Sequence, residues 1–121
     1  MQIYKLKRFA RFAKKHKIDD QILIDLIEQA ENGLIDANLG GGVIKLRLAK
    51  QGQGKSSGYR TIIYYRAGDK AFFSDIFEKN DMENISLEDE IIYKMDAKSY
   101  LTQSAEQIQQ LIDHHLLFKI Q

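Results

Sequence analysis

Basic side chains dominate the residues of this sequence that could carry chemistry, and they gather in its middle third. Lysine and arginine suit a polyanionic partner, because each phosphate contact releases bound counterions, and arginine can grip a phosphate through two parallel hydrogen bonds. Interleaved aromatic side chains could stack on unpaired bases, as single-stranded RNA is usually held. The basic candidates are Lys45, Arg47, Lys50, Lys55, Arg60, Arg66 and Lys79. The aromatic candidates are Tyr59, Tyr64, Tyr65 and Phe77.

The same pattern has a plainer interpretation. Alternating Lys and Arg on a strand are commonly the solvated face of a sheet. Large aromatic side chains in a small sheet commonly pack against the helices that cover it. The residues alone therefore leave two alternatives open, a nucleic-acid surface and an ordinary sheet with one solvated face.

Other chemistries lack the residues that they need. There is no cysteine, which removes disulfides, thiolate zinc sites and a cysteine nucleophile. No pair of acids is marked for acid–base work, and His16 stands alone while the adjacent His114 and His115 would point apart on a helix. The run 52–58 is similar to a phosphate-binding loop, but Ala49 stands where the Walker pattern requires glycine. We expect no metal and no cofactor.

Length and charge bound the remaining possibilities. A chain of 121 residues fits one domain, residues 1–121. Without cysteine or a secretory leader, the expected compartment is the cytoplasm, and no apolar run approaches the roughly 20 residues needed to span a bilayer. Residues 1–79 carry a net charge of +6 and residues 80–121 one of −5. This asymmetry favours a polyanionic partner for the first part.

Two helices are expected ahead of the cationic region. Residues 4–17 hold seven basic residues and no acid, with Leu6, Phe9, Ala10 and Ala13 at helical spacing. Asp19 or Asp20 would cap a second helix over 20–32, with Gly33 as its left-handed C-cap. We expect the two helices to form an antiparallel hairpin. The basic face of the first, which includes Lys14 and Lys15, fits solvent, RNA or an acidic protein partner.

The periodicity changes to two after the glycine turn at 40–42. Strands are expected over 43–49, 59–66 and 70–79, with Lys45 and Arg47 on one face of the first, so the pattern predicts a three-stranded antiparallel meander. Ser86 begins a capping-box pattern that opens a helix. That helix carries Leu87, Ile91, Ile92 and Met95.

The last part of the chain predicts one more helix and a short strand. Ser104 opens a helix with Ile108, Leu111 and Ile112, and residues 116–120 could form a closing strand. The order helix, helix, three strands, helix, helix indicates an α+β fold with a small antiparallel sheet.

Residues 39–86 resemble the RelE/HigB-like toxins of bacterial toxin–antitoxin pairs. That branch is typified by a glycine turn, a K-x-R-x-A strand, a GKSGGYR-type loop and an F-x-K-N-x-x-x-N-I-S close. Here these elements are residues 40–42, 45–49, 54–60 and 77–86, with Ser57 in place of one glycine. The helices on either side are also similar to that branch, so the resemblance covers nearly the whole chain.

The resemblance implies the RelE-like fold, with an N-terminal helical hairpin packed on a small antiparallel sheet and helices at the C-terminus. It implies a metal-free endoribonuclease that cuts mRNA on the ribosome, by attack of a ribose 2′-OH on the adjacent phosphate. It further implies a neighbouring antitoxin, a helix-turn-helix protein, that blocks the toxin and represses the operon.

Our hypothesis for the site distributes roles among the basic residues. A lysine surrounded by positive charge gives up its proton more easily, so Lys55 or Lys50 would take the 2′-OH proton. Arg47 and Arg60 would stabilise the charged phosphate. Lys79 and Asn80 would orient the RNA or protonate the leaving oxygen. The residues expected to bind RNA around them are Lys45, Tyr59, Arg66, Lys14 and Lys15.

Two other functions remain open at this point. A ParE-like toxin shares this fold but inhibits DNA gyrase by binding, without nuclease activity. A plain RNA- or protein-binding module is the third alternative. Against gyrase inhibition, the basic residues gather on the sheet and its loop, where an RNA site would lie.

Overall fold

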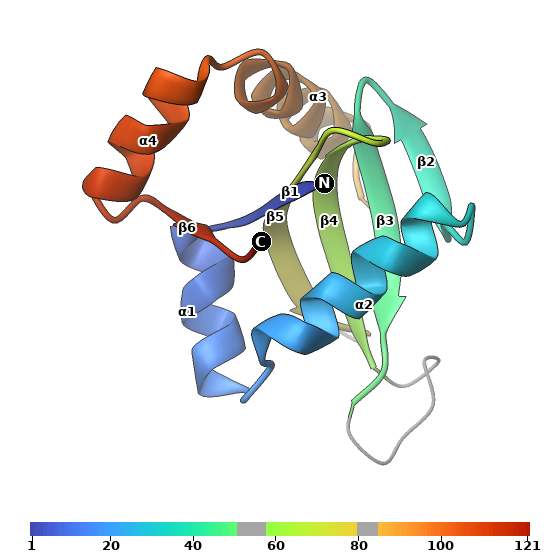
Figure 1. Ribbon diagram of the computed structural model, residues 1–121. Helices are drawn as coiled ribbons and strands as arrows, with labels where there is room; N and C mark the ends of the chain where they lie inside the picture. Colours follow the sequence, from blue (N-terminus) through green and yellow to red (C-terminus); the bar gives the residue numbers. More distant parts are fainter. Residues whose placement is uncertain (51–57, 80–84) are drawn as a thin grey trace.

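The computed structural model describes residues 1–50, 58–79 and 85–121, and in them a mixed sheet lies between two layers of helices (Figure 1). The helices are α1 (Lys7–Lys15), α2 (Asp20–Glu31), α3 (Leu87–Leu101) and α4 (Ala105–Asp113). The strands are β1 (Gln2–Leu6), β2 (Ala37–Gly40), β3 (Val43–Leu48), β4 (Tyr59–Arg66), β5 (Lys70–Glu78) and β6 (Leu117–Lys119). The expected α+β class is confirmed.

The sheet has six strands in the order β2-β3-β4-β5-β1-β6. The expected meander is confirmed as β3, β4 and β5, which pair antiparallel in sequence order. The short closing strand is also confirmed, as β6, which pairs antiparallel with β1. β1 runs parallel to β5, so the sheet is larger than expected and is not wholly antiparallel.

The beginning of the chain corrects the sequence prediction. Residues 2–6 form β1, and the first helix starts only at Lys7. Tyr4 and Leu6 are buried on one face of this strand, while Ile3 is buried on the other. The helical spacing of Leu6 with Phe9 was misleading, because β1 gains hydrogen bonds from both β5 and β6 that a local pattern does not contain.

The second helix follows the sequence prediction closely. Asp19 is its N-cap, with a side chain that accepts a hydrogen bond from the Ile22 N–H, and Gly33 follows its end at a φ of +86°. The antiparallel hairpin of α1 with α2 is not confirmed. α1 packs on β5, β1 and β6, and Figure 1 shows α2 crossing β3 and β4 instead of running beside α1.

Each face of the sheet has its own apolar core. The core under α1 and α2 includes Phe9, Leu23, Ile63 and Phe73. The core under α3 and α4 includes Ile62, Tyr64, Phe72, Leu101 and Ile108. β4 and β5 contribute to both cores, as alternating side chains of a central strand must.

The helix α3 differs from a usual amphipathic surface helix, because its apolar residues are spread almost evenly around it. Ala97 and Leu101 are buried on the sheet. The four apolar residues named above, Leu87, Ile91, Ile92 and Met95, are all exposed. Ser86 caps the helix by accepting from the Asp89 N–H, whereas the two-way capping box occurs at Ser104 of α4.

Gly58 precedes β4 where that strand separates from β3. A Cβ atom at Gly58 would lie 2.1 Å from the Leu48 carbonyl oxygen and 2.9 Å from the Ala49 Cα. Neither backbone atom can move without disturbing the ladder in which Leu48 pairs with Tyr59. We expect Gly58→Ala to lower the free energy of unfolding by about 2–3 kcal/mol, measured by urea denaturation.

Gly68→Ala is the matched control for this substitution. A Cβ atom at Gly68 meets nothing within 4 Å, and the residue has a φ of +72°. The control should therefore lower the free energy of unfolding by only roughly 1 kcal/mol, the cost of an alanine in the left-handed conformation. Equal losses in the two variants would contradict the close approach at Gly58.

Candidate functional site

Arg47 of β3 and Arg60 of β4 lie directly opposite each other in the sheet. Ile62, two positions from Arg60, belongs to the core under α3, so both arginines are on the α3 side of the sheet, because side chains alternate along a strand. Lys45 shares this face, and Phe77 of β5 is the partner of Arg60 on its other side. The structure thus brings together three of the expected cations and one half-buried aromatic ring.

Asp36 holds Arg47 in place. One oxygen of its carboxylate accepts from the Arg47 backbone N–H at 2.7 Å, and the other accepts from the Arg47 Nε at 2.8 Å. The guanidinium has five N–H donors, and its two terminal nitrogens have no partner among the described residues. Sequence reasoning missed Asp36, which lies in the turn before β2 and carries no motif.

Lys50 and Tyr59 lie on the opposite face from the two arginines. The Lys50 Nζ pairs with Glu78 at 3.1 Å and sits 5.3 Å from the centre of the Tyr59 ring. Tyr59 is 7% exposed and packs edge-on against Phe12 and His16. The Tyr59 ring therefore belongs to the core under α1 and α2, and it has no open face for a base.

The other expected residues are dispersed. Arg66 ends β4, six residues from Arg60, so roughly 20 Å separates them along the strand. Lys14 and Lys15 are exposed at the end of α1, and Lys79 is exposed just after β5. Lys55 and Asn80 lie outside the described residues. The expected constellation is therefore only partly assembled on one surface.

A polar network that the sequence did not reveal lies beside the arginines on the same face. Arg8 of α1 contacts both carboxylate oxygens of Asp75, at 2.8 and 3.1 Å, and donates to the Ser74 hydroxyl at 2.8 Å. Tyr64 donates to Asp96 of α3 at 2.5 Å, and its hydroxyl lies 2.9 Å from that of Ser74. These bonds join α1, β4, β5 and α3.

A bulge in β5 makes this network possible. The register shifts after Ile62, which pairs with Asp75, while Ile63 pairs with Phe73. Ser74 is the extra residue, and a bulge of this kind re-aims side chains near functional sites. It lets Ser74 and Asp75 both reach Arg8. No sequence signal marks the bulge, because neither Ser74 nor Asp75 is a glycine.

Burial raises the pKa of several tyrosines around this network. The pKa of Tyr64 is far above its usual value because the side chain is buried and because it donates to the Asp96 carboxylate. Burial also raises the pKa of Tyr93 to about 12, with further contributions from Asp75 and Asp89. Both hydroxyls therefore keep their protons at neutral pH, and Tyr64 uses its proton to donate to Asp96.

Two further properties of the described residues bear on function. Within residues 1–50, 58–79 and 85–121, no group of three or more histidines, aspartates or glutamates is arranged as metal ligands. In the same part of the chain, no helix combines the length and apolar character needed to cross a membrane.

The mixed sheet, its two helical layers and the cations Lys45, Arg47 and Arg60 on one face are compatible with a RelE-like toxin, the class that the sequence motifs indicate. The family model described as the RelE toxin of the RelE/RelB toxin–antitoxin system matches residues 1–120. The chain belongs to this family and is the toxin of a toxin–antitoxin pair, whose partner is a cognate antitoxin. No curated protein matches it.

The Tyr64 network predicts a specific loss of stability in alkali. An unfolded tyrosine loses its proton near pH 10, whereas buried Tyr64 keeps its proton to higher pH. The contribution of Tyr64 to the free energy of unfolding is therefore fully present below pH 10. Above pH 10 the free energy of unfolding falls, by up to roughly 1.4 kcal/mol per pH unit for each such group.

We expect Tyr64→Phe to make this alkaline fall shallower. At pH 7 the variant should have a free energy of unfolding about 1–2 kcal/mol lower than the parent, because Asp96 loses the hydrogen bond from the buried Tyr64 hydroxyl. Urea denaturation at a series of pH values between 7 and about 11.5 measures both effects. Identical slopes for variant and parent above pH 10 would show that Tyr64 does not control the alkaline transition.

Proposed function

We propose that this toxin is a ribosome-dependent mRNA endoribonuclease whose scissile phosphate binds between Arg47 and Arg60. The supporting observation is their direct opposition on neighbouring strands. Opposed residues have Cβ atoms roughly 5 Å apart, and like charges in that arrangement destabilise a sheet. A phosphate that bridges the two guanidiniums would offset this repulsion between them.

The surroundings of the arginines support RNA as the ligand. The Asp36 carboxylate fixes the Nε edge of Arg47, which leaves the terminal nitrogens for a phosphate. Lys45 lies on the same face and has no ion pair among the described residues, so it would bind a neighbouring phosphate. Half-buried Phe77 beside Arg60 offers a ring on which an unpaired base could stack.

The proposed reaction is an internal transfer of the phosphate. The ribose 2′-oxygen attacks the adjacent phosphorus and gives its proton to a base. The bond from phosphorus to the 5′-oxygen breaks, and that oxygen takes up a proton. The products are a 2′,3′-cyclic phosphate and a free 5′-OH. Arg47 and Arg60 stabilise the extra negative charge on the phosphate during this step.

Lys55 is the proposed base, and Asn80 with Lys79 is proposed to orient the RNA or supply the final proton. Lys55 and Asn80 lie outside the described residues, so these roles rest on the family resemblance alone. Lys50 is not proposed as the base, because its pairing with Glu78 and Tyr59 holds it on the opposite face of the sheet.

The test is to induce the chain alone in bacteria and map transcript 5′ ends on translated and untranslated copies of one message. In-frame cuts confined to the translated copy are expected. We expect Arg60→Ala to reduce cutting by about 100-fold or more, as for loss of one charge-stabilising donor. Arg66→Ala, at the other end of the same strand, is the matched control and should cut normally.

Two outcomes would contradict this proposal. Growth arrest without cuts in either copy, together with DNA damage, would favour gyrase inhibition instead. Normal cutting by a folded Arg60→Ala variant would remove Arg60 from the site. The thermal unfolding of each variant shows whether it is folded.

A further inference from the structure

The outer surface of α3 is the most apolar exposed feature of the described residues. Four of the eight large hydrophobic residues exposed there come from this one helix. They are Leu87 at 73% exposure, Ile91 at 51%, Ile92 at 62% and Met95 at 69%. We call these four residues the α3 face. Leu87, Ile91 and Met95 recur every four residues and so form one stripe. A contiguous apolar patch of this kind marks an interaction site.

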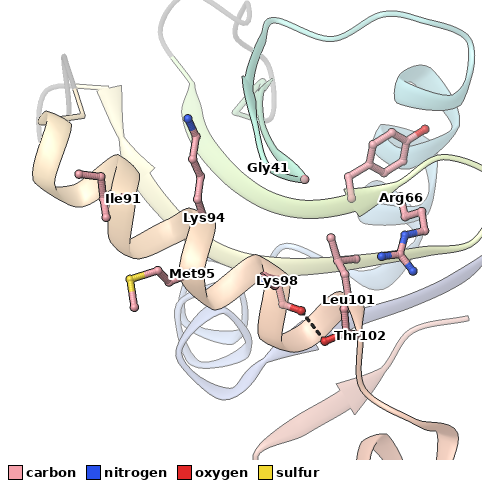
Figure 2. Close-up of a pocket in the computed structure, with 10 residues that line it drawn as sticks. Gly41, Arg66, Ile91, Lys94, Met95, Lys98, Leu101 and Thr102 are labelled. Atoms are coloured by element: carbon pink, nitrogen blue, oxygen red, sulfur yellow. Dashed lines mark hydrogen bonds between the residues drawn. The ribbon is translucent and has the colours of Figure 1, made fainter.

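Hollows border this stripe on both sides. One cavity of about 580 Å³ lies between α3 and the turn at Gly41, and Ile91, Met95 and Leu101 contribute to its wall (Figure 2). A second cavity of about 630 Å³ lies on the other side, with Ile92, Met95 and Arg8 in its lining. An apolar ridge between two hollows fits the interlocking side chains of a docked helix.

The rim of the first cavity is cationic. Arg66, Lys94 and Lys98 line it, and no acidic residue does (Figure 2). Lys94 pairs with Glu90 of its own helix at 3.1 Å, and Arg66 pairs with Asp69 at 3.6 Å. Lys98 has no ion pair in the described part of the chain. The charged residues that line the second cavity are instead Arg8, Asp75 and Asp96. A complementary partner therefore carries apolar side chains on one stripe and carboxylates on the side that meets the first cavity.

We propose that the α3 face and its cationic rim dock an acidic amphipathic helix of the cognate antitoxin. The inference rests on the toxin–antitoxin pairing that the family establishes, and not on the cleavage of RNA. An mRNA backbone does not fit this surface, because the exposed apolar stripe gives phosphates no partner. The apolar stripe accounts for affinity, and Lys98 with Arg66 accounts for the acidic character of the bound helix.

The test compares acidic substitutions on the α3 face with a matched one elsewhere. Ile91→Glu and Met95→Glu each place a carboxylate in the apolar stripe, and both sites are exposed, so the fold should tolerate them. Leu34→Glu is the control, because Leu34 is 65% exposed and lies in the turn before β2. Binding of the full-length chain to its co-expressed, purified antitoxin is measured by calorimetry, and melting temperatures report folding.

Each α3 variant should bind the antitoxin about 100-fold more weakly, as for the loss of a central contact residue. Leu34→Glu should stay within about threefold of the parent, since ordinary surface changes contribute little. Lys98→Glu should weaken binding about tenfold and make it less sensitive to salt. In cells, the α3 variants should still arrest growth, and the antitoxin should no longer relieve the arrest.

Three results would overturn the proposal. The first is antitoxin binding by both α3 variants within about threefold of the parent, at unchanged melting temperature. The second is normal antitoxin binding with growth arrest abolished, which would assign the α3 face to the cellular target. The third is a parent dimer that the α3 variants abolish without loss of antitoxin binding, which would assign it to a second copy. Because binding is measured without RNA, its result is independent of whether the toxin cuts mRNA.

Discussion

Burial of the central strands on both faces is the constraint on which the rest of the structure depends. β4 and β5 carry large apolar side chains toward both helical layers, with Ile63 and Phe73 under α1 and α2 and Ile62 and Phe72 under α3 and α4. Each such side chain contributes about 1.5–3 kcal/mol when it is fully buried. A single layer of helices would leave half of this surface in water, so the chain needs helices before and after the meander.

The helical layer of α3 and α4 buries a polar group, the Tyr64 hydroxyl, together with the network that satisfies it. Tyr64 is fully buried under α3, and its hydroxyl needs a partner because an unpaired buried polar group is costly. Asp96 accepts from it, while Ser74 and Asp75 connect the network to Arg8. These directional bonds fix which face of α3 meets the sheet. The same choice leaves the α3 face in solvent, where it is available to a partner.

The arginine pair lies where the coverage by α3 ends. Arg47 and Arg60 continue the face that carries Ile62 and Tyr64, toward the end of the sheet where Leu48 of β3 pairs with Tyr59 of β4. Asp36 fixes the Nε edge of Arg47 at 2.8 Å, and Arg60 lies directly opposite on the neighbouring strand. We place the proposed site there because two guanidiniums on neighbouring strands can bind one phosphate together.

Local patterns in the sequence were sufficient for the meander, for an aspartate cap of α2 at position 19 or 20, for the closing strand and for the family, because alternation and capping act between residues near in sequence. They also placed Lys45 and Arg47 correctly on one face of the first strand of the meander, whereas the position of Arg60 opposite Arg47 came only from the structure. Only the tertiary structure decided that residues 2–6 form a strand, that Lys50 lies on the opposite face of the sheet from Arg47 and Arg60, and that Arg8 pairs with Asp75. Each of these depends on partners distant in the sequence, such as β5 for β1 and Glu78 for Lys50. A periodicity within one segment carries no information about such partners.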